Sequence, residues 1–421
     1  MKNKQNQQNF SSRTLFQSIF LTSDLFVDNS LLQSASSCAF GFLFSLLPVI
    51  LLILIVLTRV LHTNQDILAE FYPYLQGFLS KEQYETITDS VLEIKKIGIF
   101  EIITVFAIFW ISRRFFVTVM QVFHKIFKNQ TSRKNLFFTL GGFIGEVIII
   151  FSLSAITALF VTIAPFFRSN YLFRVFPDLE TNLIQFLIKI GPHILLFLAT
   201  FFTYRFAPGT KPSIKLCLST AFCSSGIYFV IQKFLKLFLN MSRYNLVYGV
   251  LSNLIVLLLE VFIFFQIFLF FAQFIYVSQF FETLLLGELY LLPKRESQSF
   301  FARIKRFLFI KPSKLVNRKG NVIHIEKGQQ IYEAGSQGSD VFYIVSGFAE
   351  IVKNNHVEYA NPGSFLGEVS AFLDIPREAT VVAQTDLQLV KIKEEDFQTL
   401  LQTNPKVTQR LLENVAKVKL N

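Results

Sequence analysis

The chain has 421 residues and a mean hydropathy of +0.47, and 52% of its residues are hydrophobic, among them 52 phenylalanines. This composition is too apolar for an ordinary soluble enzyme and indicates a membrane protein. The formal net charge is +11, but the basic residues cluster at the ends of apolar segments. Membrane orientation explains such a distribution better than nucleic-acid binding does, so no nucleic-acid partner is expected.

The N-terminal region precedes the first long apolar segment. Residues 1–11 are polar, and no apolar run follows closely enough for a cleavable signal peptide. Residues Thr14–Leu32 mix large apolar side chains with Ser, Asp and Asn. This mixture predicts an amphipathic helix on the inner face of the membrane, and residues 1–33 are therefore assigned to a cytoplasmic tail and an interfacial helix.

Six apolar stretches follow, each long enough for the roughly 20 helical residues that cross a bilayer. Inside hydrocarbon only helices and closed barrels satisfy their own backbone groups, so the predicted fold is an α-helical polytopic membrane bundle of six spans, over residues 34–280. The spans are approximately Ser37–Val60, Ile97–Met120, Leu136–Ile163, Thr181–Tyr204, Ile214–Leu239 and Tyr248–Ser278.

The loops between the spans predict the topology. The connections between spans two and three and between spans four and five are basic, as is the segment after span six, whereas residues 61–96 are acid-rich. Basic loops stay on the cytoplasmic side. Both termini are therefore expected in the cytoplasm, with the chain in a bacterial inner (plasma) membrane.

Ionisable residues inside the spans are candidates for a membrane cavity. Glu146 and Glu260 lie within spans three and six, and Lys189 and His193 lie one turn apart in span four. Either glutamate could bind a cation or carry a proton, or it could be protonated and make an interhelical hydrogen bond. Cys38, Cys217 and Cys223 lie in or beside apolar spans without metal-ligand spacing, so they are interpreted as small buried residues and no metal site is expected.

Three segments of this bundle carry a family resemblance. Residues Ser37–Val49, Tyr204–Pro208 and Ser242–Gly249 resemble the first span and the approaches to spans five and six of the YihY/BrkB family of membrane proteins. The resemblance covers about residues 30–280 and implies a membrane role. Two positions depart from the family pattern: Glu260 replaces an aromatic residue, and Gln273 replaces an acid. The family was once labelled ribonuclease BN, but the five histidines are dispersed, and no catalytic residue is expected.

A basic connector, residues 281–317, follows the bundle. Residues 280–292 remain apolar and predict an interfacial helix, and Phe307–Ile310 lies between charged residues that could contact anionic lipid. Beyond the connector the apolar residues alternate in short segments separated by Gly, Pro or Asn, and two helical segments close the chain. The predicted strands are Val322–Ile325, Val341–Val345, Ala349–Val352, Ala379–Ala383 and Leu387–Ile392, and the helices are Glu394–Leu401 and Val407–Val418.

The segment Gly363–Thr380 has the features of a phosphate cradle. Gly367 permits close backbone approach to a ligand, and a short helical turn after it offers unpaired N–H groups to an anion. Arg377 supplies a planar fork for phosphate oxygens, and Glu368 can accept hydrogen bonds from sugar hydroxyls.

This segment resembles the phosphate-binding cassette of cyclic-nucleotide-binding domains, and the resemblance extends over residues 318–421. It implies a β-roll with flanking helices and a regulatory ligand, cAMP or cGMP, with no cofactor. By this resemblance Glu368 holds the ribose 2′-hydroxyl and Arg377 the cyclic phosphate. The residue after the arginine is Glu378, an acid that lacks the hydroxyl associated with guanine, which favours cAMP. The remaining cassette positions expected at the ligand are Gly367, Val369, Ser370, Ala379 and Thr380.

The sequence therefore predicts a non-enzymatic membrane protein, a transporter or lipid-handling protein that cyclic nucleotide regulates. The alternatives are a cyclic-nucleotide-gated channel, a membrane-anchored sensor or scaffold without transport activity, and a degenerate cassette that binds nothing. The lipid bilayer is an expected partner, and a lipid substrate and an oligomer both stay open.

Overall fold

The computed structural model describes residues 12–55, 82, 85–86, 89, 115–127, 193–238, 250–292, 300–309, 322–353 and 356–420. The chain divides into two compact units. One holds residues 24–276, and the other holds residues 1–23 together with 277–421. Helices α1 (Ser12–Asp28) and α12 (Val250–Gln279) each run from one unit into the other.

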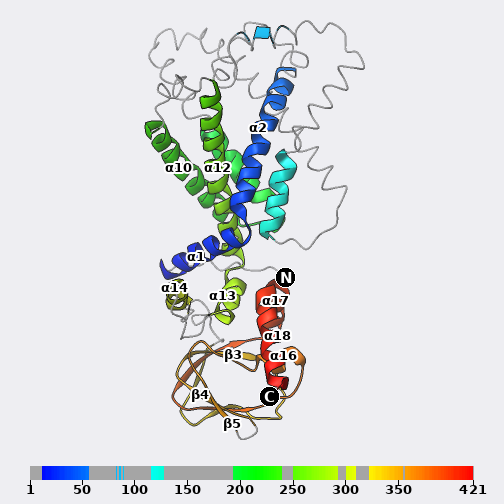
Figure 1. Cartoon of the computed structure of the whole chain (residues 1–421). Helices are drawn as coiled ribbons and strands as arrows, with labels where there is room; N and C mark the ends of the chain where they lie inside the picture. Colours follow the sequence, from blue (N-terminus) through cyan, green and yellow to red (C-terminus); the bar gives the residue numbers. More distant parts are fainter. Residues whose placement is uncertain are drawn as a thin grey trace, which may run out of the picture. The chain divides into compact units, whose positions relative to one another are not determined.

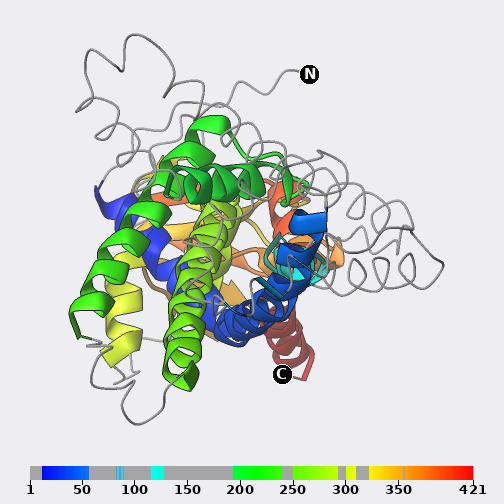
Figure 2. The same cartoon turned by 90° about the horizontal axis from the view of Figure 1, so that it is seen from above.

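The described parts of the first of these units are helices joined by turns (Figures 1 and 2). Helix α2 (Leu31–Ile55) covers most of predicted span one, α10 (Ile214–Phe238) covers span five and α12 covers span six. Two further apolar helices, Phe115–Phe127 and His193–Phe206, fall at the ends of spans two and four. Span three lies outside the described residues. Among those residues, two helices are long and apolar enough to cross a membrane, Ile214–Leu235 and Ile255–Gln279.

Aromatic contacts join these helices. Phe42 of α2, Phe115 and Phe265 of α12 form a triangle of rings with centroids 5.6 to 6.4 Å apart. The Tyr204 hydroxyl donates a hydrogen bond of 2.8 Å to the carbonyl oxygen of Phe268, and the two rings stack at 5.1 Å. Such aromatic pairs add to the packing stabilisation of apolar helices. Cys38 and Cys217 are buried as expected, whereas Cys223 is exposed and does not fit the interpretation as a small buried residue.

The second unit contains two connector helices, α13 (Phe281–Tyr290) and α14 (Phe300–Phe309). The helix expected over residues 280–292 is present as α13, and part of its apolar surface is buried within the unit. Phe281, Leu285 and Leu289 are buried, and α13 packs against α17 (Glu394–Thr403). Gly287 permits this close approach, because a Cβ there would lie 2.7 Å from the side-chain nitrogen of Asn404.

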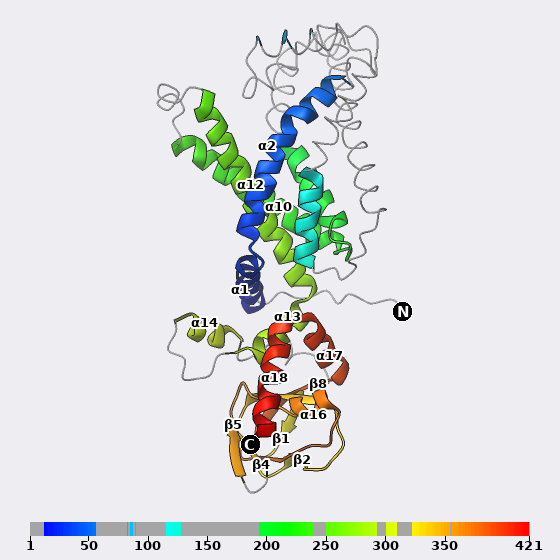
Figure 3. The same cartoon turned by 45° about the vertical axis from the view of Figure 1, so that its right-hand side comes forward.

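Two four-stranded antiparallel sheets follow (Figure 3). The first has the order β1-β8-β3-β6 and the second β2-β7-β4-β5. The strands are β1 (Val322–Ile325), β2 (Gln330–Tyr332), β3 (Val341–Ser346), β4 (Ala349–Lys353), β5 (His356–Ala360), β6 (Phe365–Leu366), β7 (Thr380–Ala383) and β8 (Leu387–Ile392).

The core of this domain is formed by residues from both sheets, with Ile344 and Leu389 from one and Ala349 and Val381 from the other. Alternate inward-facing residues of paired strands build such a core. Short helix α16 (Glu368–Leu373) lies between β6 and β7, and α17 and α18 (Pro405–Leu420) close the chain. The five predicted strands and both terminal helices are present, while β2, β5 and β6 were not predicted.

Candidate functional site

Arg377 is the centre of the candidate site. Its side chain is only 4% exposed. One terminal nitrogen donates a hydrogen bond of 3.0 Å to the carbonyl oxygen of Gly367, and the other donates one of 2.6 Å to the carbonyl oxygen of Asp340. The guanidinium lies over the ring of Tyr332, 4.6 Å from its centroid. The Nε atom is buried without a hydrogen-bond partner.

A buried guanidinium with neutral partners is electrostatically incomplete. Backbone carbonyls supply dipoles but no negative charge, and a buried cation is costly unless a counter-charge or further hydrogen bonds satisfy it. Within the part of the chain that the structure describes, no carboxylate forms an ion pair with Arg377. The group is therefore suited to accept an anion.

The backbone around Arg377 explains how the side chain is placed. Its N–H donates to the carbonyl oxygen of Ser336, and its own carbonyl accepts from the N–H of Gly335. Two glycines make room for the guanidinium. A Cβ at Gly338 would lie 3.2 Å from it, and a Cβ at Gly367 would overlap it outright. Gly367 also adopts a positive φ of 80° as the residue before α16, a conformation that glycine reaches at little cost.

Helix α16 supplies the acidic side of the site. It begins at Glu368, and its first amides lie beyond the reach of intrahelical acceptors. Ser370 is buried, while Val369, Ala379 and Thr380 are half-buried. The hydroxyl of Thr380 accepts a hydrogen bond of 3.1 Å from the N–H of Ala334. The predicted cassette residues are thus brought together by the β6–α16–β7 segment.

The pKa of the Glu368 carboxyl is raised above its ordinary value. Burial raises its pKa to about 7, although its own N–H and the charge of Arg377 act in the opposite direction. Burial is the main cause of the raised pKa values of Tyr290 and Tyr332, and the negative charge of Glu368 raises both further. A carboxyl whose pKa lies near neutrality gains or loses a proton when a polar ligand binds beside it and changes its hydrogen bonds and solvation.

Glu378 is the residue that directly follows Arg377 in the cassette. Its carboxylate pairs with the ammonium of Lys353 at 2.7 Å. The pairing follows from the register of the sheet, because β4 pairs with β7 and Val352 lies opposite Thr380. The negative charge of Glu378 is therefore compensated by a neighbouring strand.

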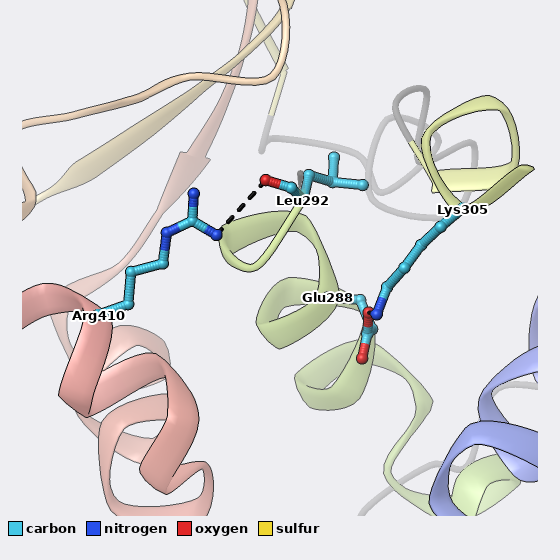
Figure 4. A network of polar contacts seen from close by, with 4 residues as sticks. All are labelled: Glu288, Leu292, Lys305 and Arg410. Carbon is cyan, nitrogen blue, oxygen red and sulfur yellow. Dashed lines mark hydrogen bonds and ion pairs between the residues drawn. The ribbon is translucent and has the colours of Figure 1, made fainter. Parts of the chain in front are cut away.

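The connector helix α13 reaches the same site. The ring of Tyr290 packs against Phe365 with centroids 5.0 Å apart, and its hydroxyl accepts a hydrogen bond of 3.4 Å from the Asn414 amide of α18. Figure 4 shows two further polar contacts, one made by α13 and one made just after its C-terminal end. Arg410 of α18 donates to the carbonyl oxygen of Leu292 at 3.4 Å, and Glu288 pairs with Lys305 of α14 at 2.5 Å.

The predicted membrane candidates are only partly visible. Glu146 and Lys189 lie outside the described residues. His193 packs edge-on against the ring of Phe229 at 4.9 Å. Glu260 is half-buried in α12.

Gln273, which stands where the resembling family has an acid, is fully buried in α12. Its Oε1 accepts a hydrogen bond of 3.1 Å from the Asn29 amide in the turn between α1 and α2. The amide therefore retains a polar role at this position without carrying a charge.

The sequence analysis missed three residues of the site. Tyr332 lies outside the predicted strands, Lys353 directly follows one of them, and Tyr290 belongs to the helix expected on the membrane surface. An aromatic residue just before a glycine turn is a weak signal for stacking on arginine. The contacts of Lys353 and Tyr290 depend on long-range pairing, which local patterns do not reveal.

Comparison with known families agrees with this architecture. A family model described as Virulence factor BrkB matches residues 22–282, more than half of the chain. The chain belongs to this family. A second model, described as Cyclic nucleotide-binding domain, matches residues 322–404. This BrkB-family membrane protein therefore carries a C-terminal cyclic-nucleotide-binding domain, as the two resemblances in the sequence predicted.

Curated relatives of this BrkB-family chain match it over a short region. A cyclic nucleotide-gated potassium channel of Mesorhizobium japonicum is 33% identical over 85 residues, 20% of this chain and 24% of the channel. A cAMP-dependent protein kinase regulatory subunit of Eremothecium gossypii is 35% identical over 80 residues, 18% of each chain. The chain thus spans about a quarter or less of the length of these relatives.

Solved structures match a region of similar size. One titled "A cyclic-GMP-dependent signalling pathway regulates bacterial phytopathogenesis" has 27% sequence identity and a TM-score of 0.23, and the match covers 25% of this chain and 90% of that chain. Another, titled "cAMP bound PfPKA-R (141-441)", has 30% identity and a TM-score of 0.22, and the match covers 23% of this chain and 35% of that chain.

The pKa of Glu368 predicts a pH dependence of stability. The folded-state pKa, about 7, lies above the model-compound value of 4.5, so the folded state binds the extra proton between these values. The stabilising contribution is complete below pH 4.5 and is lost as the pH rises through about 7. We expect calorimetric melting of the nucleotide-binding domain, in the detergent-solubilised full chain, to occur at lower temperature at pH 8 than at pH 6.

Glu368→Gln is the matched control, because the amide keeps the shape of the side chain and cannot ionise. The difference in melting temperature between wild type and this variant should change with pH across the same window. Parallel curves for the two proteins would contradict the assignment of a raised pKa to Glu368.

Proposed function

We propose that this protein is a six-span transporter or lipid-handling protein of the bacterial inner membrane, controlled by cyclic nucleotide on its cytoplasmic C-terminal domain. The observation that carries the regulatory part is the buried guanidinium of Arg377, which has two carbonyl partners, an unpartnered Nε and no ion-paired carboxylate in the described residues. A cyclic phosphate supplies the missing charge and acceptor atoms.

The other cassette groups fit the remainder of such a ligand. The carboxyl of Glu368 can accept a hydrogen bond from the ribose 2′-hydroxyl, and the first amides of α16 are available to an anion at the helix start. The phosphate draws the guanidinium away from the carbonyl oxygens of Gly367 and Asp340. We favour cAMP over cGMP, because Glu378 offers no hydroxyl to guanine and because kinase regulatory subunits described as cAMP-dependent are among the relatives.

The signal then passes through α13. Tyr290 lies within electrostatic reach of Glu368 and packs on Phe365, so a change of charge or position at the cassette acts directly on the connector. Ligand binding shifts the population of two packings of α13 against α17 and α18. A preference of about a hundredfold for one packing supplies about 2.7 kcal/mol, enough to switch a near-balanced equilibrium.

The role of the bundle rests on family membership and on the pattern of spans and loops. Basic loops favour cytoplasmic termini, which places the nucleotide domain where cyclic nucleotides are made. The matches to potassium channels span about 85 residues, the length of the nucleotide domain alone, and leave most of each channel unmatched. These matches therefore support cyclic-nucleotide binding by this chain more than they support channel activity. The proposed protein catalyses no reaction and binds no nucleic acid.

Titration calorimetry on the full chain in lipid nanodiscs tests the proposal. We expect micromolar or tighter binding of cAMP, with weaker binding of cGMP. Arg377→Ala removes the charged hydrogen bonds to the phosphate, which contribute about 1.5–3 kcal/mol each, and should weaken binding by at least about a hundredfold.

Lys391→Ala is the matched control for Arg377→Ala. It removes a cation that also contacts Asp340, at 2.6 Å through the carboxylate, but that lies outside the cradle. This variant should bind like wild type. Absence of cAMP and cGMP binding to the wild-type chain, or equal affinities of wild type and Arg377→Ala, would refute the regulatory role.

The Lys353–Glu378 pair gives a second prediction. Lys353→Ala leaves the acid uncompensated beside the expected phosphate, and partly exposed pairs of this kind contribute about 0.2–1 kcal/mol. Nucleotide affinity should therefore fall by up to about fivefold in the single variant. The double variant Lys353→Ala with Glu378→Ala should recover the affinity in the same calorimetric assay. Equal affinities of the single and double variants would show that Glu378 does not act on the ligand.

A further inference from the structure

Helix α1 has an inverted distribution of polarity. On an ordinary surface helix the apolar side is buried and the polar side is exposed. In the first half of α1 the exposed residues are large and apolar, with Leu15 42% and Phe16 63% exposed, and Ile19 is exposed as well. The opposite side is buried although most of it is polar, and it comprises Thr14, Gln17, Ser18, Leu21 and Thr22.

Two hydroxyls on the buried side donate hydrogen bonds within the helix. Ser18 donates to the carbonyl oxygen of Thr14 at 2.9 Å, and Thr22 donates to that of Ser18 at 2.7 Å. These two hydroxyls are therefore buried with hydrogen-bond partners. The exposed apolar side is the unexplained half of the helix, and it requires an apolar medium.

Helix α14 packs beside α1 (Figure 1). The Gln17 amide donates a hydrogen bond of 2.7 Å to the carbonyl oxygen of Leu308, and the rings of Phe20 and Phe309 meet edge-on at 5.7 Å. Phe309 is fully buried. These contacts use one side of α14 and hold the two helices as a pair.

The exposed surface of α14 carries an aromatic residue and a cation. Phe307 is 78% exposed, and Arg303, four residues earlier on the same helical face, is also exposed. The surrounding sequence is strongly basic, because residues 293–319 hold nine Lys or Arg and one acid, Glu296. Such a segment repels a second copy of itself and attracts an anionic surface.

We propose that α1 and α14 together bind the anionic phospholipid leaflet of the membrane. Leu15, Phe16 and Ile19 of α1 and Phe307 of α14 enter the boundary between headgroups and acyl chains, and Arg303 meets the lipid phosphates. A single binding partner, the anionic leaflet, then accounts for the exposed apolar side of α1, the exposed Phe307 and the excess of positive charge.

The proposal rests on membership of a membrane protein family and not on nucleotide binding. It also gives lipid a route to the connector. Lys305 of α14 pairs with Glu288 of α13, so the depth of α14 in the leaflet acts on the same helix that contacts the cassette.

Tryptophan fluorescence in nanodiscs tests the proposal. The chain has one tryptophan, Trp110, and a Trp110→Phe background leaves a single probe at a chosen site. Phe16→Trp and Phe307→Trp should each lose emission when lipids with brominated acyl chains replace ordinary ones. Tyr359→Trp is the matched control, because Tyr359 is 65% exposed on β5 of the nucleotide domain, and its emission should stay unchanged.

The charge dependence is tested in the same assay. Replacing phosphatidylglycerol by phosphatidylcholine should reduce the quenching of the probe at position 307, and Arg303→Gln should make this lipid effect smaller. Quenching at positions 16 and 307 no greater than at position 359 would overturn the proposal. A probe response that follows protein concentration instead of lipid bromination would overturn it in favour of a contact between copies of the chain.

Discussion

The burial of the Arg377 guanidinium is the constraint on which the C-terminal domain depends. Two backbone carbonyls hold the cation, a tyrosine ring covers it, and glycines at 338 and 367 leave the space it occupies. None of these groups carries a negative charge. The arrangement keeps the cation ordered and leaves its charge available, which is the state a phosphate-binding site needs before its ligand arrives.

The connector helix α13 joins this site to the rest of the chain. Helix α13 follows directly from the last membrane helix, yet its residues are buried against α17 and tied to α18 through Arg410 and Asn414. Tyr290, at its end, contacts the cassette strand through Phe365. The cassette is therefore packed against the segment that follows α12 directly in the chain, and Lys305 of α14 pairs with Glu288 of the same segment.

Much of this architecture could be predicted from local pattern. The bounds of β1 and β8 were predicted to the residue, because regular apolar alternation marks half-buried strands. Strand β5 was missed since its first four residues are all exposed, and β6 has only two residues. The roles of Tyr332 and Lys353 depend on strand pairing between distant segments, which the sequence pattern does not specify. The inverted polarity of α1 also depends on which side is buried.

The central claim is that nucleotide binding at Arg377 alters the packing of α13. Hydrogen exchange of the full chain in nanodiscs measures this directly, through the amides of residues 281–292 with and without saturating cAMP. The account predicts that protection of these amides changes with ligand in the wild-type chain and stays constant in Arg377→Ala. Bound cAMP that leaves their exchange unchanged in the wild-type chain would contradict the account.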